Sequence, residues 1–121
     1  MNTPPSILST GSLAEAIDII RVDIDRGVIV LDENDHVLGI LTEGDIIRAM
    51  RRGILKETLV GQIMTGHVRV TTSILSSREL AREFAESGTL LIPVVDSERR
   101  LVDVQRAREA VSTLLDHGPN A

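Results

Sequence analysis

The sequence of 121 residues lacks cysteine, tryptophan and tyrosine, and Phe84 is its single phenylalanine. Without cysteine the chain has neither a disulfide framework nor thiolate chemistry. With so few aromatic rings, the core must be built from Val, Ile, Leu and Ala, and a bound purine would lie against aliphatic walls. The length suffices for one compact domain with a hydrophobic core of its own.

Positive charge is scarce as well, because 13 lysines and arginines stand against 18 aspartates and glutamates, a formal net charge of −5. This balance argues against a general electrostatic affinity for nucleic acid or for an anionic membrane. No apolar run approaches the ~18 residues of a membrane span. The first ten residues also lack the basic end and apolar stretch of a secretory signal. We therefore expect a cytoplasmic protein whose partners include neither nucleic acid nor a membrane.

Motifs of catalysis and metal binding are missing too. There is no GxGxxG or GxxxxGK[ST] pattern, and no residue lies in a recognisable nucleophile motif. The histidines, His36, His67 and His117, share no metal-ligand spacing. Residues 32–43 resemble a calcium loop, but Val37 stands where the sharp turn of such a loop requires glycine, so a β-turn is favoured. We predict no catalytic residue, no metal site and no enzymatic activity.

An internal repeat is the first positive feature of the chain. The segments GVIVLDENDHVLGIL and LLIPVVDSERRLVDV share one template, with Val30 on Val94 and Asp32 on Asp96 at an offset of 64. Two amphipathic stretches upstream, SLAEAIDII and SSRELAREF, align at the same offset. Such a period indicates two copies of one supersecondary unit, each unable to cover its apolar face alone.

Each unit predicts the same order of elements. An extended piece comes first, over 6–8 and 67–71. A helix follows, opened by a Ser-x-x-Glu capping box and ended near Gly27 or Gly88. Two strands joined by a polar turn come next, over 27–32 with 37–41 and over 90–96 with 101–105. A closing helix ends each unit, over 44–52 and 106–115, and the segment between the units contains a helical turn over 60–64.

The strands VIVL and LLIPVV are apolar at every position, which is typical of a sheet covered on both faces. Pro93 within the second of them indicates an edge position or a strand start. The predicted fold is of the α/β (α+β) class, with two β-α-β-β-α units packed sheet to sheet about a pseudo-two-fold axis. The predicted boundaries are 6–53 for the first unit, 54–66 for the linker, 67–116 for the second unit and 117–121 for a tail.

These features together resemble a pair of cystathionine-β-synthase (CBS) domains, also called a Bateman module. The resemblance rests on the repeat, on the strand ends VIVLD and IPVVD, on VGQIMT in the linker and on GILTEGDIIRAM after the first hairpin. It covers residues 6–115. The last two segments are most similar to CBS pairs attached to sugar-phosphate nucleotidyltransferases or sugar-phosphate isomerases.

The resemblance implies a non-catalytic regulatory module. Such pairs bind an adenosyl ligand, such as AMP, ADP, ATP or S-adenosylmethionine, in a cleft between the repeats and signal to an attached or partner enzyme domain. They also assemble into homodimers. Two alternatives remain open: a dimerisation module with a vestigial ligand site, and the N-terminal regulatory part of a sugar-phosphate nucleotidyltransferase.

The candidate site lies at Gly39, Thr42 and Asp45, which match the Gly-h-h-Thr/Ser-x-x-Asp pattern of the family. The resemblance implies that Asp45 binds the ribose hydroxyls and that Thr42 lies near ribose or phosphate. Thr42 and Asp45 also fit an ordinary helix cap, and the two roles are compatible. The other predicted ligand contacts are the backbone of Gly27, Val28 and Ile29 at the base edge, the bare backbone of Gly44, and Arg48 at a phosphate.

The second unit departs from this pattern, because Asp103, Arg106 and Glu109 stand opposite the three site residues. The glycine and the hydroxyl are lost, and the acid is one methylene longer. We expect one functional site and a degenerate second one, with Arg106 either packed at the surface or reaching a phosphate held by the first unit. His67 is a further candidate contact, although a solvated loop explains it as well.

Overall fold

The structure of the protein is a computed structural model that describes residues 3–116. The first repeat contains β1 (Ser6–Leu8), α1 (Leu13–Ile20), β2 (Gly27–Leu31), β3 (Val37–Thr42), α2 (Glu43–Ala49) and the 3-10 turn η1 (Met50–Arg52). A second 3-10 turn, η2 (Val60–Gln62), lies in the linker. The second repeat contains α3 (Ser77–Ser87), β4 (Leu91–Val95), β5 (Leu101–Arg106) and α4 (Glu109–Asp116). The predicted tail, 117–121, lies outside the described residues.

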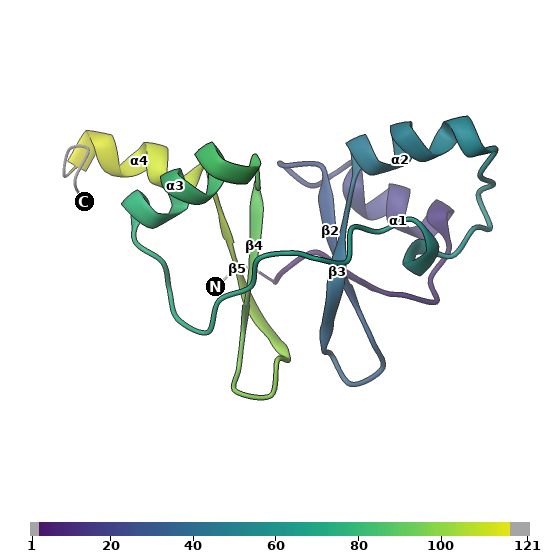
Figure 1. Cartoon of the computed structure of the whole chain (residues 1–121), viewed down its shortest axis with the longest axis horizontal. Coiled ribbons are helices and arrows are strands. Elements are labelled where there is room, and N and C mark those ends of the chain that lie inside the picture. The colour runs from purple at the N-terminus through teal and green to yellow at the C-terminus, as the bar shows by residue number, and fades with distance from the viewer. Residues whose placement is uncertain (1–2, 117–121) are drawn as a thin grey trace.

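The two sheets pack against each other, as the apolar strands predicted (Figure 1). In β2, Val28 and Val30 belong to a core shared with α1, whereas Ile29 and Leu31 belong to a core shared with β4. All four side chains are buried. The inter-repeat core is therefore continuous with the core of the first repeat through β2, and this packing sets the position of the cleft described below.

A pseudo-two-fold relation between the repeats is visible at the hairpin tips. The Val37 amide donates to the Arg99 carbonyl (3.3 Å), and the Leu101 amide donates to the Asp35 carbonyl (2.9 Å). The two bonds join the same pair of positions in opposite directions, at the repeat offset of 64. Asp35 and Arg99 both have left-handed backbone, with φ of 67° and 66°. The predicted symmetric pairing of the two units is thus confirmed.

The first extended piece of the second unit departs from the prediction. The first repeat has a three-stranded sheet in the order β1-β2-β3, with β1 parallel to β2, whereas the second has only β4 and β5. Residues 67–71 form a single parallel bridge, between Thr71 and Val94. The cause is Pro93: the equivalent Ile29 amide donates to the Pro5 carbonyl (2.8 Å), and proline has no N–H to donate.

Two predicted helix boundaries are also wrong. Helix α1 ends at Ile20 and not near Gly27, because the chain leaves the helix at Arg21 and turns through an acidic loop before β2. In that loop the Asp23 carboxylate accepts from the amides of Asp25 and Gly27. Helix α4 begins at Glu109 rather than at 106, since Arg106 is the last residue of β5. Helix α3 ends as predicted at Gly88, whose φ is 69°.

The helices and strands of residues 3–116 are all short. Within this part of the chain, no helix has the length and apolar character needed to cross a membrane.

Candidate functional site: the cleft between the repeats

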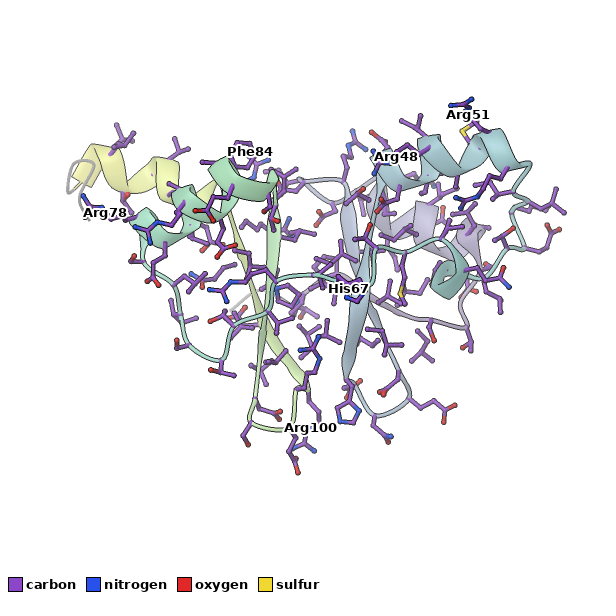
Figure 2. The ribbon with its side chains drawn as sticks, viewed as in Figure 1. Arg48, Arg51, His67, Arg78, Phe84 and Arg100 are labelled. Atoms are coloured by element: carbon purple, nitrogen blue, oxygen red, sulfur yellow. The ribbon has the colours of Figure 1, made fainter. Side chains whose placement is uncertain are left out.

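A cleft of about 780 Å³ opens between the two repeats. The first repeat contributes the end of β3 and the start of α2, and the second contributes the end of α3 and the segment leading into β4. In the structure the linker continues beyond η2 without a helix or strand to residue 69, and it forms a third wall through residues 65 and 67–69. Figure 2 shows His67 on the linker, where it crosses from one repeat to the other, with Arg48 and Phe84 on the helices above.

Thr42 and Asp45 form a complete capping box at the start of α2. The Thr42 hydroxyl accepts from the Asp45 amide (3.2 Å), and Asp45 Oδ2 accepts from the Thr42 amide (2.9 Å). The Thr42 hydroxyl also lies 3.0 Å from Asp45 Oδ2 and can donate to it. The predicted cap is confirmed, and it leaves the second carboxylate oxygen of Asp45 for other partners.

That second oxygen, Asp45 Oδ1, accepts from Arg48 Nη2 at 2.7 Å and from the Thr65 hydroxyl at 3.2 Å. The Asp45 side chain is 10% exposed, whereas that of Arg48 is 73% exposed. An exposed ion pair contributes little net free energy. Arg48 can therefore be exchanged for another donor, such as a ligand hydroxyl, without disturbing the cap on Oδ2.

The opposite wall of the cleft carries two hydroxyl groups from the second repeat. Ser87 and Thr89 flank Gly88, and their oxygens are 2.6 Å apart. Arg69 on the linker pairs with Glu83 on α3 at 2.9 Å, so the linker and the second repeat are tied together along the cleft. The cleft thus presents a carboxylate on one side and hydroxyl groups on the other.

The charges lining the cleft are nearly balanced. Four acidic residues, Asp25, Glu43, Asp45 and Glu83, stand against three arginines, Arg26, Arg48 and Arg69. Arg48 and Arg69 are paired with cleft acids, as described above, and Arg26 donates to the Arg21 carbonyl. The cleft therefore has little uncompensated positive charge for a polyphosphate.

The predicted contacts divide into two groups. Thr42, Gly44, Asp45 and Arg48 line the cleft, and so does His67. Gly27, Val28, Ile29 and Gly39 are not among the residues that line it.

Packing explains the second group. The side chains of Val28 and Ile29 are wholly buried. A Cβ on Gly27 would lie 2.6 Å from Leu91 Cδ1, and one on Gly39 would lie 2.4 Å from the Thr65 carbonyl oxygen. The two glycines are thus needed for contacts within the protein, while a role of these four residues in ligand binding stays a prediction.

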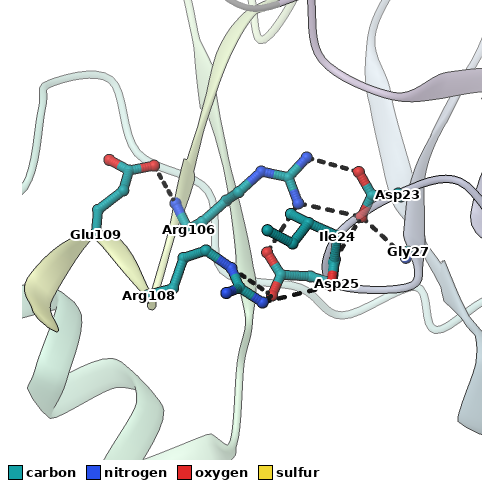
Figure 3. Close-up of polar contacts among 7 residues, drawn as sticks. All are labelled: Asp23, Ile24, Asp25, Gly27, Arg106, Arg108 and Glu109. Carbon is teal, nitrogen blue, oxygen red and sulfur yellow. Dashed lines mark hydrogen bonds and ion pairs between the residues drawn. The ribbon is translucent and has the colours of Figure 1, made fainter. Parts of the chain in front are cut away.

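The pseudo-symmetric counterpart of the cleft has different chemistry (Figure 3). Arg106 Nη2 contacts Asp23 Oδ1 at 2.7 Å, and Arg106 Nη1 contacts Asp25 Oδ2 at 2.8 Å. Arg108 Nη2 contacts Asp25 Oδ1 at 2.6 Å. The Arg106 side chain is only 16% exposed, so the alternative of simple surface packing is wrong. The alternative of a reach to a phosphate is also not what the structure shows, because both aspartates occupy the guanidinium.

These contacts shift the titration of all four groups. Burial raises the pKa of Asp23, but the hydrogen bonds from Arg106 and the Gly27 amide outweigh it and leave that pKa below the ordinary value. For Asp25, burial is likewise outweighed by Arg108 and Arg106, and its pKa is also lowered. The pKa of Arg106 is raised by its hydrogen bond with Asp23. The pKa of Arg108 is raised by its hydrogen bond with Asp25. Both aspartates are therefore charged at neutral pH.

Sequence reasoning did not identify Asp23, Asp25 or Arg108. A signal was present, since two acids two residues apart precede β2 where the second repeat has Ser87 and Thr89. It was hidden by the expectation of a helix up to Gly27. Among residues 3–116, no group of three His, Asp or Glu side chains is arranged to hold a metal ion.

Comparison with known proteins supports the resemblance seen in the sequence. Residues 1–52 match the family model of the CBS domain. The chain is 29% identical over 100 residues, 82% of its length, to arabinose 5-phosphate isomerase KdsD of Pseudomonas aeruginosa. It spans 30% of that protein and 30–39% of the length of the curated relatives it matches.

Two solved structures extend the likeness over almost the whole chain. Staphylococcus aureus OpuCA is 28% identical with a TM-score of 0.73, covering 96% of each chain. The CBS domain pair of protein MJ0100, in complex with 5′-methylthioadenosine and S-adenosyl-L-methionine, is 27% identical with a TM-score of 0.77. That match covers 95% of this chain and 93% of the other. The predicted resemblance is confirmed: the first repeat matches the CBS domain model, and the chain has the fold of a CBS domain pair.

Proposed function

We propose that this chain is a regulatory module that binds an adenosyl ligand in the cleft between its repeats. One observation carries the proposal: Asp45 faces the cleft with a carboxylate oxygen whose main partner, Arg48, is exposed and replaceable. A carboxylate oxygen accepts from hydroxyl groups of a ribose, and its charge strengthens such bonds. The ligands held by the similar MJ0100 domain pair are of this class.

The charge of the cleft narrows the choice of ligand. Because Arg48 and Arg69 are already paired with cleft acids, and four acidic residues line the cleft against three arginines, a ligand with one phosphate or none fits better than a triphosphate. We therefore favour S-adenosylmethionine, 5′-methylthioadenosine or AMP over ADP and ATP. Displacement of Arg48 from Asp45 by the ribose would free its guanidinium for the phosphate of AMP. Binding between the repeats would tighten their relative orientation, which an attached or partner domain could sense.

Thermal unfolding tests the proposal. A ligand at 100 times its Kd stabilises a protein by about 2.7 kcal/mol, which raises the Tm of a domain of this size on the order of 10 °C. We expect such a rise with one of AMP, ADP, ATP, S-adenosylmethionine or 5′-methylthioadenosine. CMP and 2′-deoxy-AMP should give a smaller rise, because they lack the adenine base and the second ribose hydroxyl respectively.

Asp45→Asn is the informative variant, since asparagine keeps one oxygen for the cap but loses the charge that binds the ribose. We expect the ligand-induced rise in Tm to disappear. Glu15→Gln is the matched control, because Glu15 closes the same type of capping box on α1, which does not line the cleft. A ligand response that survives Asp45→Asn as fully as Glu15→Gln would contradict the assignment of Asp45.

A second function, assembly without a ligand, is favoured by apolar side chains exposed on the helices. Phe84 on α3 is 47% exposed, and Val111, Leu114 and Leu115 on α4 are exposed to a greater extent. These side chains would suit a homodimer or a fused domain. If no nucleotide stabilises the wild type while light scattering shows a dimer that Phe84→Ser dissociates, the chain acts as an assembly module.

The attached or partner domain is part of the same proposal. The chain covers 30% of a relative named as a sugar-phosphate isomerase, so a sugar-phosphate enzyme is the domain we propose for it to regulate. A gene that continues beyond Ala121 into such a domain would support this assignment, and co-purification of a separate enzyme would support a partner in trans.

A further inference from the structure

The two clefts of the molecule are built from equivalent positions, which strand register identifies. Thr42 pairs with Gly27 across β2 and β3, and Arg106 pairs with Leu91 across β4 and β5. Thr42 and Arg106 are therefore the same position in the two repeats. One half of the cap is retained, since Glu109 accepts from the Arg106 amide at 2.7 Å. The other half is lost, because arginine offers no acceptor to the helix.

The facing loops are equivalent as well. Ser87 and Thr89 lie four and two residues before β4, and Asp23 and Asp25 lie four and two residues before β2. The first cleft thus has hydroxyl groups at the positions where the second has carboxylates. With threonine replaced by arginine on the other wall, the second cleft carries opposite charges on its two sides, and these charges meet across it.

We infer that Asp23, Asp25, Arg106 and Arg108 form an ionic latch that obstructs the second cleft, so that the Arg106 guanidinium takes the place of a ligand. The side chains of Asp23 and Asp25 are 7% and 2% exposed. The hollow that remains is about 460 Å³, and Arg106 and Arg108 are among its walls. The chain consequently offers one binding cleft, and the latch joins the loop before β2 to Arg106 and Arg108 of the second repeat.

The latch fixes the relative orientation of the two repeats more than it adds to the net free energy of unfolding. A buried ion pair gains little over an apolar pair of the same shape, but removal of one partner leaves an uncompensated buried charge. Arg106 places two donors on Asp23 and one on Asp25, which holds the end of β5 against the acidic loop. Closure of the first cleft on a ligand would then pivot about this ionic contact. The statement on ligand number rests on the proposed function, whereas the latch itself does not.

Unfolding of the ligand-free protein tests the latch. Arg106→Thr, which installs the residue of the first repeat, should lower the Tm on the order of 10 °C, because it leaves the buried Asp23 carboxylate without a counter-ion and removes one of the two arginines from Asp25. The control is Arg100→Thr, which removes an exposed ion pair with Asp96 and should lower the Tm by less than about 3 °C. If Arg106→Thr lowers the Tm no more than the Arg100 control does, the latch is not closed in solution and the inference is wrong.

A combined variant tests the latch even if Arg106→Thr alone does not fold. Asp23→Ser/Asp25→Thr/Arg106→Thr/Glu109→Asp gives the second cleft the loop hydroxyl groups and the helix cap of the first, and it leaves no buried charge without a partner. We expect it to recover most of the Tm lost in Arg106→Thr. Recovery supports the latch even if the single variant does not fold, and a combined variant less stable than Arg106→Thr would overturn it.

Equilibrium dialysis with S-adenosylmethionine then counts the sites. We expect one molecule per wild-type chain and two per chain of the combined variant. Two molecules on the wild type, or one on a cooperatively folded combined variant, would overturn the obstruction of the second cleft. If the wild type binds none of the adenosyl ligands, the proposed function fails, and the latch is judged on the unfolding measurements alone.

Discussion

Gly39 has a role in packing that is separate from the ligand contact its motif predicts. The Ile40 amide donates to the Thr65 carbonyl, and the Thr65 amide donates to the Ile40 carbonyl, at 3.0 and 2.9 Å. Gly39 lies beside this paired contact, where a side chain would collide with the linker backbone. The residue therefore lets the linker cross β3 closely, and it places Thr65 within reach of Asp45.

Gly39→Ala should accordingly destabilise the fold. Overpacking against backbone costs about 1–3 kcal/mol, because the linker must move and the paired hydrogen bonds lengthen. Chemical denaturation monitored by circular dichroism measures the loss. The matched control is Gly66→Ala, next to Thr65 in the same linker, where an added Cβ meets nothing within 4 Å. Equal effects of the two substitutions would contradict the assigned role of Gly39.

At the scale of elements, the two repeats differ most in their first strand. In the first repeat β1 pairs with β2, and the Ile29 amide donates a hydrogen bond to the Pro5 carbonyl at the start of this pairing. In the second, Thr71 donates to the Pro93 carbonyl and accepts from the Val95 amide, but the ladder cannot extend past Pro93. Residues 67–69 therefore run beside the cleft as irregular backbone and line it. The loss of a strand thus places the linker in the site.

Pro93→Ile should restore the missing donor. We expect the new amide at position 93 to donate to the Arg69 carbonyl and to exchange with solvent more slowly than an unbonded amide, by on the order of 10-fold. Hydrogen exchange followed by NMR measures this rate, with the Val95 amide, already bonded to Thr71, as the internal reference. Rapid exchange at position 93 would show that the lack of a donor is not what stops the strand.

At the scale of the whole molecule, the two inter-repeat clefts have opposite designs. One is open, with an exchangeable carboxylate oxygen and hydroxyl groups. The other is spanned by four charges from two segments about 80 positions apart in the sequence. This asymmetry makes acid titration a readout of the relation between the repeats, because hydrogen bonds from arginines of the second repeat help to lower the pKa of Asp23 and of Asp25 against the effect of burial.

The expected pH dependence follows from the direction of those shifts. A carboxylate with a lower pKa when folded adds stability above its unfolded pKa of about 3.9, and this contribution is lost as the pH falls through the folded pKa. The Tm of the wild type should therefore change little from pH 7 to 5 through these groups and fall below about pH 4. Differential scanning calorimetry across this range measures it.

Arg106→Thr should weaken this dependence. Asp23 then loses the guanidinium that lowers its pKa and keeps only the amides of Asp25 and Gly27 against the effect of burial, while Asp25 still pairs with Arg108. The folded and unfolded pKa values of Asp23 therefore lie closer together, and the Tm of the variant should fall less steeply than that of the wild type below about pH 4. A variant whose Tm follows the wild-type profile would contradict the pairing of Arg106 with Asp23.

Much of the fold was predictable because its signals are local. The capping boxes of α1, α2 and α3 join residues three positions apart. The strands are apolar on both faces, which predicted a sheet covered on both sides. Thr42 and Asp45 were predictable for the same reason, since the cap that positions them lies within one turn of helix. The close packing of Gly27, Val28, Ile29 and Gly39 was not predictable, because a motif states order along the chain and not which face a neighbour covers.

The sequence by itself determined the repeat, the order of the elements and the cap that aims Asp45, because periodicity and capping act between residues a few positions apart. The sequence also predicted a degenerate second site, but only the tertiary structure decided how the second cleft is closed. That outcome depends on Arg106 meeting Asp23 at a separation of 83 positions, and on the linker crossing β3 at Gly39. Contacts of this kind exist only once the sheets have packed, since no local pattern brings the partners together.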